Sequence, residues 1–580
     1  MIKRLSKCIR EYKLPSILAP IFIACEVILE VFIPRIMGWL IDNGIDKGDT
    51  GYVIRTGFLL VILCTLSLLS GVASGTAAAK ASSGFAKNLR HDMYHNVQSF
   101  SFASIDKFST SGLVTRLTTD VTNLQNSYQM IIRIAVRSPA MLIFSLTMAL
   151  NINARISLIF LCVIPFLALG LYLIVSHAHP VFKRVFKTYD KLNSVVNENL
   201  HGIRVVKSFV REDKEEEKFK TVSGTIFSDT KKAESLLAFN APLMQFSSYL
   251  CMLLIAWFGA KLIIASNATE MTTGDLFSVI TYTMQILSTL MMLSMIFVML
   301  TMSKASGERV CEVLNEVTDL NNPENPVYQV KDGSIEFENV GFSYAKSEDN
   351  LCLKNVNISI KSGETIGIIG STGSSKTTFV QLIPRLYDVT TGTLKVGGRD
   401  VREYDLDTLR NEVSMVLQKN ILFSGTIKDN LRWGNENATD EEMIEACKLA
   451  QAHPFISEMP EGYDTYIEQG GTNVSGGQKQ RICIARSLLK KPKILILDDS
   501  TSAVDTKTDA LIRIAFKEYI PETTKIIIAQ RISSIQDADK IIVLDGGEIS
   551  AFGTHDELMK TSDIYKEVYT SQVKGGSENE

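Results

Sequence analysis

G-S-T-G-S-S-K-T-T, residues Gly370 to Thr378, is the stretch that decides the fold of this chain. It follows a short apolar segment, Thr365–Ile369, and precedes an apolar segment that begins at Phe379. This order predicts a strand, a loop and a helix. The backbone N–H groups of such a loop, together with the N-terminus of its helix, bind phosphate oxygens. The alternative is a serine-rich turn without a ligand.

Inside the loop, Lys376 is expected to reach the β- and γ-phosphates of a nucleotide, and the Thr377 hydroxyl is expected to ligate Mg²⁺. Ser375 departs from the pattern G-x-x-x-x-G-K-[ST], because it stands where the last glycine belongs. A side chain at this position strains the loop if its φ is positive. The predicted nucleotide-binding residues of the loop are Gly370, Ser371, Thr372, Gly373, Ser374, Ser375, Lys376, Thr377 and Thr378.

A second apolar run, K-I-L-I-L-D-D, extends from Lys493 to Asp499 and ends in two carboxylates. A continuous apolar run of this length fits a buried parallel strand. Such a strand would deliver Asp498 to the Mg²⁺ of the phosphate site and would place Asp499 next to an attacking water.

Between these two motifs lies N-V-S-G-G-Q-K-Q-R, Asn473 to Arg481. In this order and spacing, the chain resembles an ABC transporter, whose signature reads L-S-G-G-Q where Val474 stands here. The resemblance implies that the signature of one subunit covers the ATP held by the phosphate loop of the other. The signature residues are Ser475, Gly476, Gly477 and Gln478.

Other segments extend the resemblance over essentially the whole chain. It implies that Tyr344 stacks on adenine and that Gln418 senses Mg²⁺ and links to the membrane domain. It also matches Ser502–Asp505 to a loop that crosses the dimer interface. Two segments in the first half, Ile105–Asp120 and Gly202–Glu212, resemble the cytoplasmic loops of exporters.

The first half holds six apolar segments of the length that a membrane-spanning helix needs, which is about 20 residues. They are roughly Pro15–Ile41, Val53–Ala78, Ile131–Leu150, Ile156–Ile174, Leu243–Ile264 and Leu276–Met299. Basic residues precede the first span, so the N-terminus is expected in the cytoplasm. An even number of spans returns the C-terminus to the same side. The chain is therefore expected in the cytoplasmic membrane as a multi-pass protein.

Two long polar segments, Lys80–Tyr128 and Ser176–Asn240, connect spans on the cytoplasmic side and have helical spacing of their charges. The predicted fold is therefore multidomain. An all-α transmembrane domain of six helices with long cytoplasmic hairpins occupies residues 1–318. A linker follows at 319–332, and an α/β P-loop nucleotide-binding domain occupies 333–580.

Ionisable side chains inside the first predicted span need an explanation, because charges in a bilayer are costly. Glu26 and Glu30 share one face, and Arg35 lies near the outer end. The two carboxylates either pair with a cation such as Arg133 or Arg137 or contact substrate. The last span carries methionines that either line an adaptable substrate surface or pack ordinarily. They are Met284, Met291, Met295, Met299 and Met302.

Two departures from the family pattern fall on the catalytic positions. Asp499 stands where the family has glutamate, and its carboxylate is one methylene shorter. Gln530 stands where the family has a histidine, and an amide cannot act as a titrating acid or base. Together with the intact signature, this indicates a heterodimer in which this chain binds ATP and Mg²⁺ but hydrolyses ATP poorly. The partner is then a homologous half-transporter that completes the hydrolytic site.

The remaining properties of the sequence narrow the function. The formal net charge is −3, and no basic tract indicates a nucleic-acid partner. The nine cysteines are scattered singly, which indicates neither a zinc site nor a disulfide framework. We expect the protein to export hydrophobic or amphipathic small molecules and to contact membrane lipid. The alternatives are a dedicated lipid or peptide exporter and a nucleotide-gated membrane sensor that does not pump.

Overall fold

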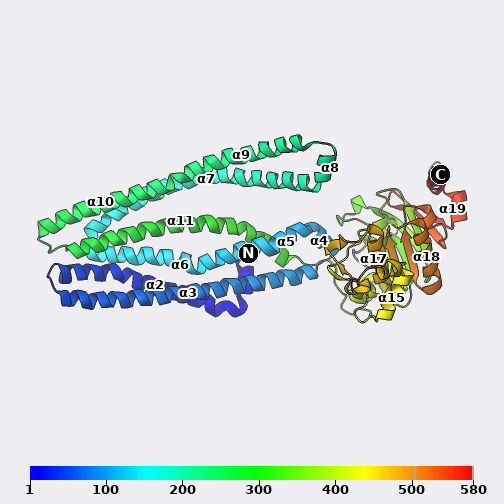
Figure 1. The fold of residues 1–580 in the computed structure, drawn as a ribbon, viewed down its shortest axis with the longest axis horizontal. Coiled ribbons are helices and arrows are strands. Elements are labelled where there is room, and N and C mark those ends of the chain that lie inside the picture. The colour runs from blue at the N-terminus through cyan, green and yellow to red at the C-terminus, as the bar shows by residue number, and fades with distance from the viewer. Residues whose placement is uncertain (501–503, 578–580) are drawn as a thin grey trace. The chain divides into compact units, whose positions relative to one another are not determined.

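The computed structural model describes residues 1–500 and 504–577; at several positions in the seventh, eleventh and twentieth helices it describes the backbone alone. The chain forms two compact units (Figure 1). The first unit comprises Met1–Gln98 and Thr110–Glu316, and the second comprises Ser99–Ser109 and Val317–Glu580. The short segment Ser99–Ser109 therefore packs with the C-terminal half of the chain, although both of its neighbours in sequence belong to the first unit.

The first unit is built from helices that run alongside one another (Figure 1). Its long helices are α2 (Lys13–Leu40), α3 (Thr50–Gln98), α6 (Val121–Ile152), α7 (Ala154–His201), α9 (Glu212–Ala238), α10 (Asn240–Ser266) and α11 (Thr273–Asn315). Short helical segments complete it: α1 (Ile2–Ser6), η1 (Lys7–Tyr12), η2 (Ile41–Ile45), α5 (Thr110–Thr115), η3 (Arg116–Asp120) and α8 (Ile203–Ser208). Helix α2 packs on α3, α6 packs on α11, and α7 packs on α9.

Several of these helices are long and apolar enough to cross a membrane. Among the described residues they are Ile2–Ile45, Thr50–Gln98, Thr110–Ile152, Pro165–His201 and Glu212–Ser266. The 49 residues of α3 measure about 73 Å at 1.5 Å per residue, well beyond the ~30 Å of a hydrocarbon core. The helices thus continue past a membrane, as predicted. The sixth predicted span lies in α11, where the side chains of Met291, Met295 and Met302 lie outside the described residues.

The charges inside the first span form a three-residue cluster between α2 and α6. Arg137 donates to a carboxylate oxygen of Glu26 and, over 2.6 Å, to Oε2 of Glu30. Of the two alternatives from the sequence, the structure therefore shows pairing with Arg137. Near the end of α2, Arg35 pairs with Asp275 of α11. Partly buried charges of this kind bind the helices together at a fixed register.

The second unit contains a sheet of six strands in the order β12-β11-β3-β10-β9-β6. The strands are β3 (Thr365–Gly370), β6 (Val413–Val416), β9 (Ile494–Asp498), β10 (Thr524–Ile528), β11 (Lys540–Asp545) and β12 (Glu548–Gly553). All neighbours pair in parallel except β11 and β12, which pair antiparallel. The strands β3, β9 and β10 are apolar almost throughout because helices cover both faces of a parallel sheet.

Helices and a smaller sheet surround this core. The antiparallel sheet β2-β1-β4-β5 consists of β1 (Ile335–Phe342), β2 (Leu353–Ile360), β4 (Thr391–Val396) and β5 (Arg399–Asp400). A two-stranded ribbon joins β7 (Gly425–Thr426) to β8 (Tyr466–Ile467). The helices are α4 (Phe102–Phe108), α12 (Lys376–Leu382), α13 (Leu406–Glu412), α14 (Ile427–Arg432), α15 (Asp440–Leu449), α16 (His453–Ser457), α17 (Gly476–Leu488), α18 (Thr506–Tyr519), α19 (His555–Thr561) and α20 (Asp563–Ser577).

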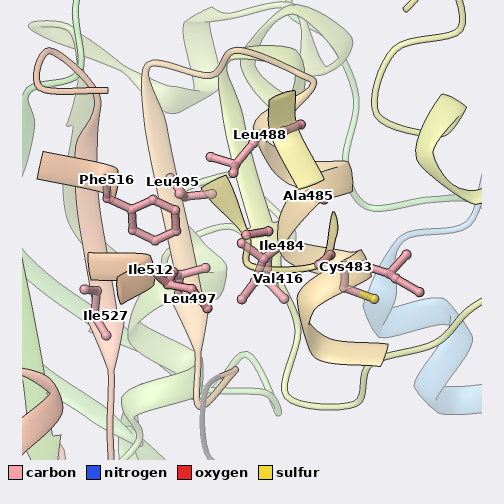
Figure 2. Packing of buried hydrophobic residues seen from close by; sticks show 14 of the residues in the cluster. Val416, Cys483, Ile484, Ala485, Leu488, Leu495, Leu497, Ile512, Phe516 and Ile527 are labelled. Carbon is pink, nitrogen blue, oxygen red and sulfur yellow. The ribbon is translucent and has the colours of Figure 1, made fainter. Parts of the chain in front are cut away.

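The hydrophobic core of the second unit fixes the strand ends that carry the motifs. Figure 2 shows side chains of β9 and β10 packed against those of α17 and α18. The packed residues include Ile484, Leu488, Leu495, Leu497, Ile512, Phe516 and Ile527. Burying a side chain of this size stabilises the fold by about 1.5–3 kcal/mol. The apolar runs therefore form a buried sheet, and the polar segments that follow them lie at its edge.

Candidate nucleotide-binding site

Three adjacent parallel strands deliver the predicted residues to one edge of the sheet. Strand β3 ends at Gly370, where the phosphate loop begins, and β9 ends at Asp498. Strand β10 lies between them and ends two residues before Gln530. Because the carboxyl ends of parallel strands meet at the same edge, residues far apart in sequence gather there.

The phosphate loop leads into the N-terminus of α12 at Lys376. Lys376 Nζ donates to the carbonyl oxygens of Gly370, over 2.9 Å, and Ser371, over 2.8 Å. Burial lowers the pKa of Lys376, while the charges of Asp499 and Asp498 raise it. The ammonium group thus lies over the loop, where it would face the phosphates of a nucleotide.

Ser375 adopts the left-handed backbone conformation, in which a side chain strains the loop. Its φ is +68° and its ψ is 24°. A residue with a Cβ is disfavoured there by about 1–2 kcal/mol relative to its right-handed conformation, whereas glycine is not. The loop therefore keeps its usual turn at the expense of local strain.

Asp498 and Thr377 meet at the end of β9. Thr377 Oγ1 donates to Asp498 Oδ1 over 3.2 Å. The other oxygen, Asp498 Oδ2, is buried and has no hydrogen-bond partner among the described residues. Burial raises the pKa of Asp498, and the hydroxyl of Thr377 opposes that effect. A hydroxyl beside a buried carboxylate with an unused oxygen matches the hard oxygen ligands that Mg²⁺ prefers.

Asp499 and Gln530, the residues at the two expected catalytic positions, contact each other. Gln530 Nε2 donates to Asp499 Oδ2 over 2.7 Å. Asp499 has a φ of +50° and is 9% exposed. Burial raises its pKa, and hydrogen bonds from Gln530 and Gln418 lower it. The carboxylate is thus held by neighbouring amides.

A cavity of about 570 Å³ joins these groups. It is lined by Ile369, Gly370, Ser371, Thr372, Gly373, Ser374, Ser375, Lys376, Thr377, Thr378, Gln418, Asp498, Asp499, Ile528, Gln530 and Val568. Every predicted residue of the loop is present, as are the four predicted carboxylate and amide residues, Gln418, Asp498, Asp499 and Gln530. Val568 belongs to α20 and was not expected from the sequence, because this C-terminal helix carries no recognisable motif.

Tyr344 lies beside the loop and not among the residues that line the cavity. Its hydroxyl is 2.9 Å from Thr378 Oγ1, and 53% of the residue is exposed. Its ring stands edge-on to those of Phe342 and Tyr387, with centroids 4.9 and 5.3 Å away. Part of the ring is free to stack on a planar ligand such as a base.

The predicted signature residues lie away from this cavity, at the N-terminus of α17. Ser475 caps the helix by accepting from the backbone N–H of Gln478, whose side chain accepts in turn from the N–H of Ser475 over 2.9 Å. Ser475 and Gly476 are exposed. A capped helix of 13 residues with an exposed first turn can bind an anion presented from outside.

The structure also reveals a contact within the second unit that sequence reasoning missed. In α4, Asp106 accepts a hydrogen bond of 2.8 Å from the hydroxyl of Tyr387, and the ring of Phe102 lies 6.0 Å from the same tyrosine. Burial and the Asp106 carboxylate raise the pKa of Tyr387. The only signal in the sequence was the stretch I-D-K-F, which resembled a loop of exporters.

Comparisons with known proteins agree with this geometry. Residues 16–291 match the family model of the ABC transporter transmembrane region, and residues 353–502 match the ABC transporter model. An uncharacterized ABC transporter ATP-binding protein, YfiB of Bacillus subtilis, is 38% identical over 98% of this chain and 99% of its own length. The chain belongs to the ABC transporters.

Within that family it is an exporter-type half-transporter, with the transmembrane region and the ATP-binding domain in one polypeptide. The ATP-dependent lipid A-core flippase of Desulfotalea psychrophila is 31% identical over 99% of both chains. The structure of a bacterial Atm1-family ABC exporter with ATP bound superimposes with a TM-score of 0.78, covering 97% of this chain and 99% of that one. Because the two sequences are 24% identical, the likeness to that solved structure shows the fold alone. This ABC transporter is thus a multi-pass membrane exporter that binds ATP.

Proposed function

We propose that this ABC transporter is the ATP-holding subunit of a heterodimeric exporter of hydrophobic or amphipathic small molecules. The observation that carries the proposal is the hydrogen bond between Gln530 and Asp499. It joins in one contact the two residues that depart from the family pattern at the catalytic positions. In the proposed dimer, this chain's own site binds ATP and hydrolyses it slowly.

The chemistry of Asp499 supports slow hydrolysis. Its carboxylate is one methylene shorter than that of glutamate, and a displacement of ~1 Å at a reacting group can cost ~10²-fold in rate. One of its oxygens already accepts from Gln530. The amide of Gln530 can hydrogen-bond a phosphate oxygen but cannot transfer a proton as an imidazole does. The site therefore has groups to hold a nucleotide and lacks a well-placed base.

The signature supports a second, working site. Ser475 and Gly476 present an intact, capped helix N-terminus to the outside, away from the cavity of the same chain. We propose that it covers ATP on the phosphate loop of a homologous subunit that retains glutamate and histidine. A homodimer of this chain would instead contain two slow sites.

We infer that Mg²⁺ accompanies ATP at the cavity. The residues that would hold it are Thr377, Asp498 and Gln418. The Oδ2 of Asp498, which has no hydrogen-bond partner among the described residues, fits a cation ligand. A bound Mg²⁺ would neutralise part of the charge of the phosphates. Lys376 then holds the phosphates from the loop side, while Tyr344 offers its ring to adenine.

Exposed apolar side chains support a protein partner. The second helical hairpin of the first unit ends in α8 and a short turn, where Val205, Phe209 and Val210 are 59%, 71% and 80% exposed. The second unit has a hollow of about 240 Å³ lined in part by Phe423 and Trp433. Apolar surface outside the membrane marks an interaction site. We propose that the hairpin tip of one subunit enters this hollow of the other.

We propose the following transport cycle for the heterodimer. In the proposed orientation, both termini and the ATP-binding domain lie in the cytoplasm. Two ATP molecules draw the ATP-binding domains together, the helical hairpins follow, and the membrane helices reopen outward. Hydrolysis at the partner's site lets the domains separate, while the site of this chain stays occupied through the cycle.

The test is to measure ATP turnover and substrate-stimulated transport for this chain alone and for the chain with its partner. A half-transporter of the same genome that carries glutamate and histidine at the two positions is the partner to use. We expect substrate-stimulated turnover in the pair only. Full pumping speed by the chain alone would refute the proposal, and nucleotide binding without any stimulation by substrate in the pair would favour a sensor that does not pump.

A lipid exporter is the second candidate, because the 31% identical relative is named as a lipid A-core flippase. Adding lipids and amphipathic drugs separately to the reconstituted pair distinguishes the two functions. Stimulation by lipid alone would select the lipid exporter.

A further inference from the structure

The C-terminal helix α20 contacts the loop that carries Gln530. Gln572 Nε2 donates to the carbonyl oxygen of Gln530 over 2.8 Å, and Gln572 Oε1 accepts from the backbone N–H of Ile532 over 2.8 Å. One side-chain amide thus bonds the backbone on both sides of Arg531. Two such bonds fix the local dihedral angles of the loop more firmly than one.

Helix α20 is itself anchored to the core of the second unit. Tyr565 is fully buried, and its hydroxyl lies 2.7 Å from His555 Nδ1. Val568 follows three residues later and lines the nucleotide cavity. Gln572 comes seven residues after Tyr565, so it lies on about the same face two turns further on. The anchored helix therefore places the amide of Gln572 against the loop.

The next contact continues toward the nucleotide site. Gln572 holds the backbone of Gln530, and the side chain of Gln530 donates to Asp499 Oδ2 over 2.7 Å. Two backbone hydrogen bonds border this loop, from the N–H of Ala529 to the carbonyl oxygen of Ile368 and from the N–H of Ser534 to that of Arg531, each over 3.2 Å. The carbonyl of Gln530 lies between them and accepts from Gln572. Without Gln572, we expect the carbonyl of Gln530 to lose the hydrogen bond that orients its peptide, which loosens the direction of the Gln530 side chain.

We propose that Gln572 is a positioning residue, which holds the loop so that the side chain of Gln530 stays directed at Asp499 and at the phosphate end of the nucleotide. The proposal rests on the proposed role of Gln530 in holding ATP and extends it to the C-terminal helix. It makes α20 part of the nucleotide site, although nothing in its sequence indicates such a role.

The test uses the purified full chain alone and measures the release rate of the fluorescent nucleotide TNP-ATP in the presence of Mg²⁺. Gln572→Met keeps the length of the side chain and removes both hydrogen bonds. We expect it to speed release about three- to tenfold, because each hydrogen bond contributes modestly in water. Ser571→Ala, at the exposed neighbouring position, is the matched control and should leave the rate unchanged. Gln572→Glu keeps the acceptor for Ile532 and should have an intermediate effect.

A double-mutant cycle separates positioning from general stability. In the background of Gln530→Ala, Gln572→Met should no longer alter the release rate, because Gln572 acts through Gln530. An equal effect in both backgrounds, or a release rate that Gln572→Met does not change in the wild type, would overturn the proposal. If Gln530→Ala itself leaves the rate unchanged, the proposed role of Gln530 fails instead. The outcome does not depend on the identity of the partner subunit.

Discussion

Gln530 Nε2 lies 2.7 Å from Asp499 Oδ2 and donates a hydrogen bond to it. The two positions are separated by 31 residues and are brought together because β9 and β10 are neighbouring parallel strands. A longer carboxylate at 499 and an imidazole at 530 would meet at the same place. Because Asp499 and Gln530 contact each other, we expect substitutions at the two positions to act as a unit.

Ser375 offers a direct test of strain in the phosphate loop. Because its φ is +68°, replacement by glycine removes the cost of a side chain in the left-handed region, which is about 1–2 kcal/mol. We expect Ser375→Gly to raise the midpoint of thermal unfolding of the ATP-binding domain and to leave nucleotide binding intact. Ser375→Ala keeps the Cβ and should give no gain. Equal effects of the two substitutions would show that strain is not the cause.

Asp498 should make stability depend on pH. Burial raises the pKa of Asp498, so its ionised form opposes folding, and that cost is present at pH values above the raised pKa. Without nucleotide and Mg²⁺, we expect Asp498→Asn to raise the unfolding midpoint at pH 8 and to lose this advantage as the pH falls through the raised pKa. Adding Mg²⁺ and ATP should raise the unfolding midpoint of the wild type more than that of the variant. If Asp498→Asn raised the unfolding midpoint equally at every pH, ionisation of Asp498 would not be the cause.

The charge cluster in the membrane unit should be essential for folding. Removing one partner of a fully buried ion pair typically costs about 3–5 kcal/mol, because it leaves an uncompensated charge, and a partly buried cluster such as this one lies below that range. Arg137→Met should therefore reduce the yield of folded protein, as measured by size-exclusion chromatography in detergent. Changing Glu26 and Glu30 to glutamine in the same chain should restore it. Arg133→Met is the matched control, since Arg133 forms no ion pair in the part of the chain that the structure describes.

A rescued triple variant also separates the two roles that the sequence allowed for the glutamates. If it folds and transports, Glu26 and Glu30 serve structure. If it folds and transports nothing, the cluster also takes part in substrate passage.

Local sequence patterns predicted much of this molecule. The loop from Gly370 to Thr378 and the strand that ends at Asp498 each carry their chemistry in a few adjacent residues, and parallel topology then brings them together. The fold class followed from these motifs and from the apolar runs, and it is confirmed. The roles of the individual site residues remain predictions.

Contacts between distant segments without motifs could not be predicted. The sequence named both Arg133 and Arg137 as partners for the glutamates, because only the register of two packed helices decides between them. The packing of Asp106 on Tyr387 joins positions 281 residues apart. Val568 and Gln572 lie in a helix of ordinary amphipathic composition. Such contacts depend on tertiary packing, which a periodic pattern does not specify.

The central claim is that Asp499 and Gln530 limit hydrolysis at this chain's own site. The most direct measurement is single-site ATP turnover, with Mg²⁺ and the partner subunit present and the partner's own site inactivated at its phosphate-loop lysine. We predict that Asp499→Glu combined with Gln530→His raises turnover at least tenfold over the wild type, and that either substitution alone achieves less. Fast turnover by the wild type that the double substitution leaves unchanged would contradict the account.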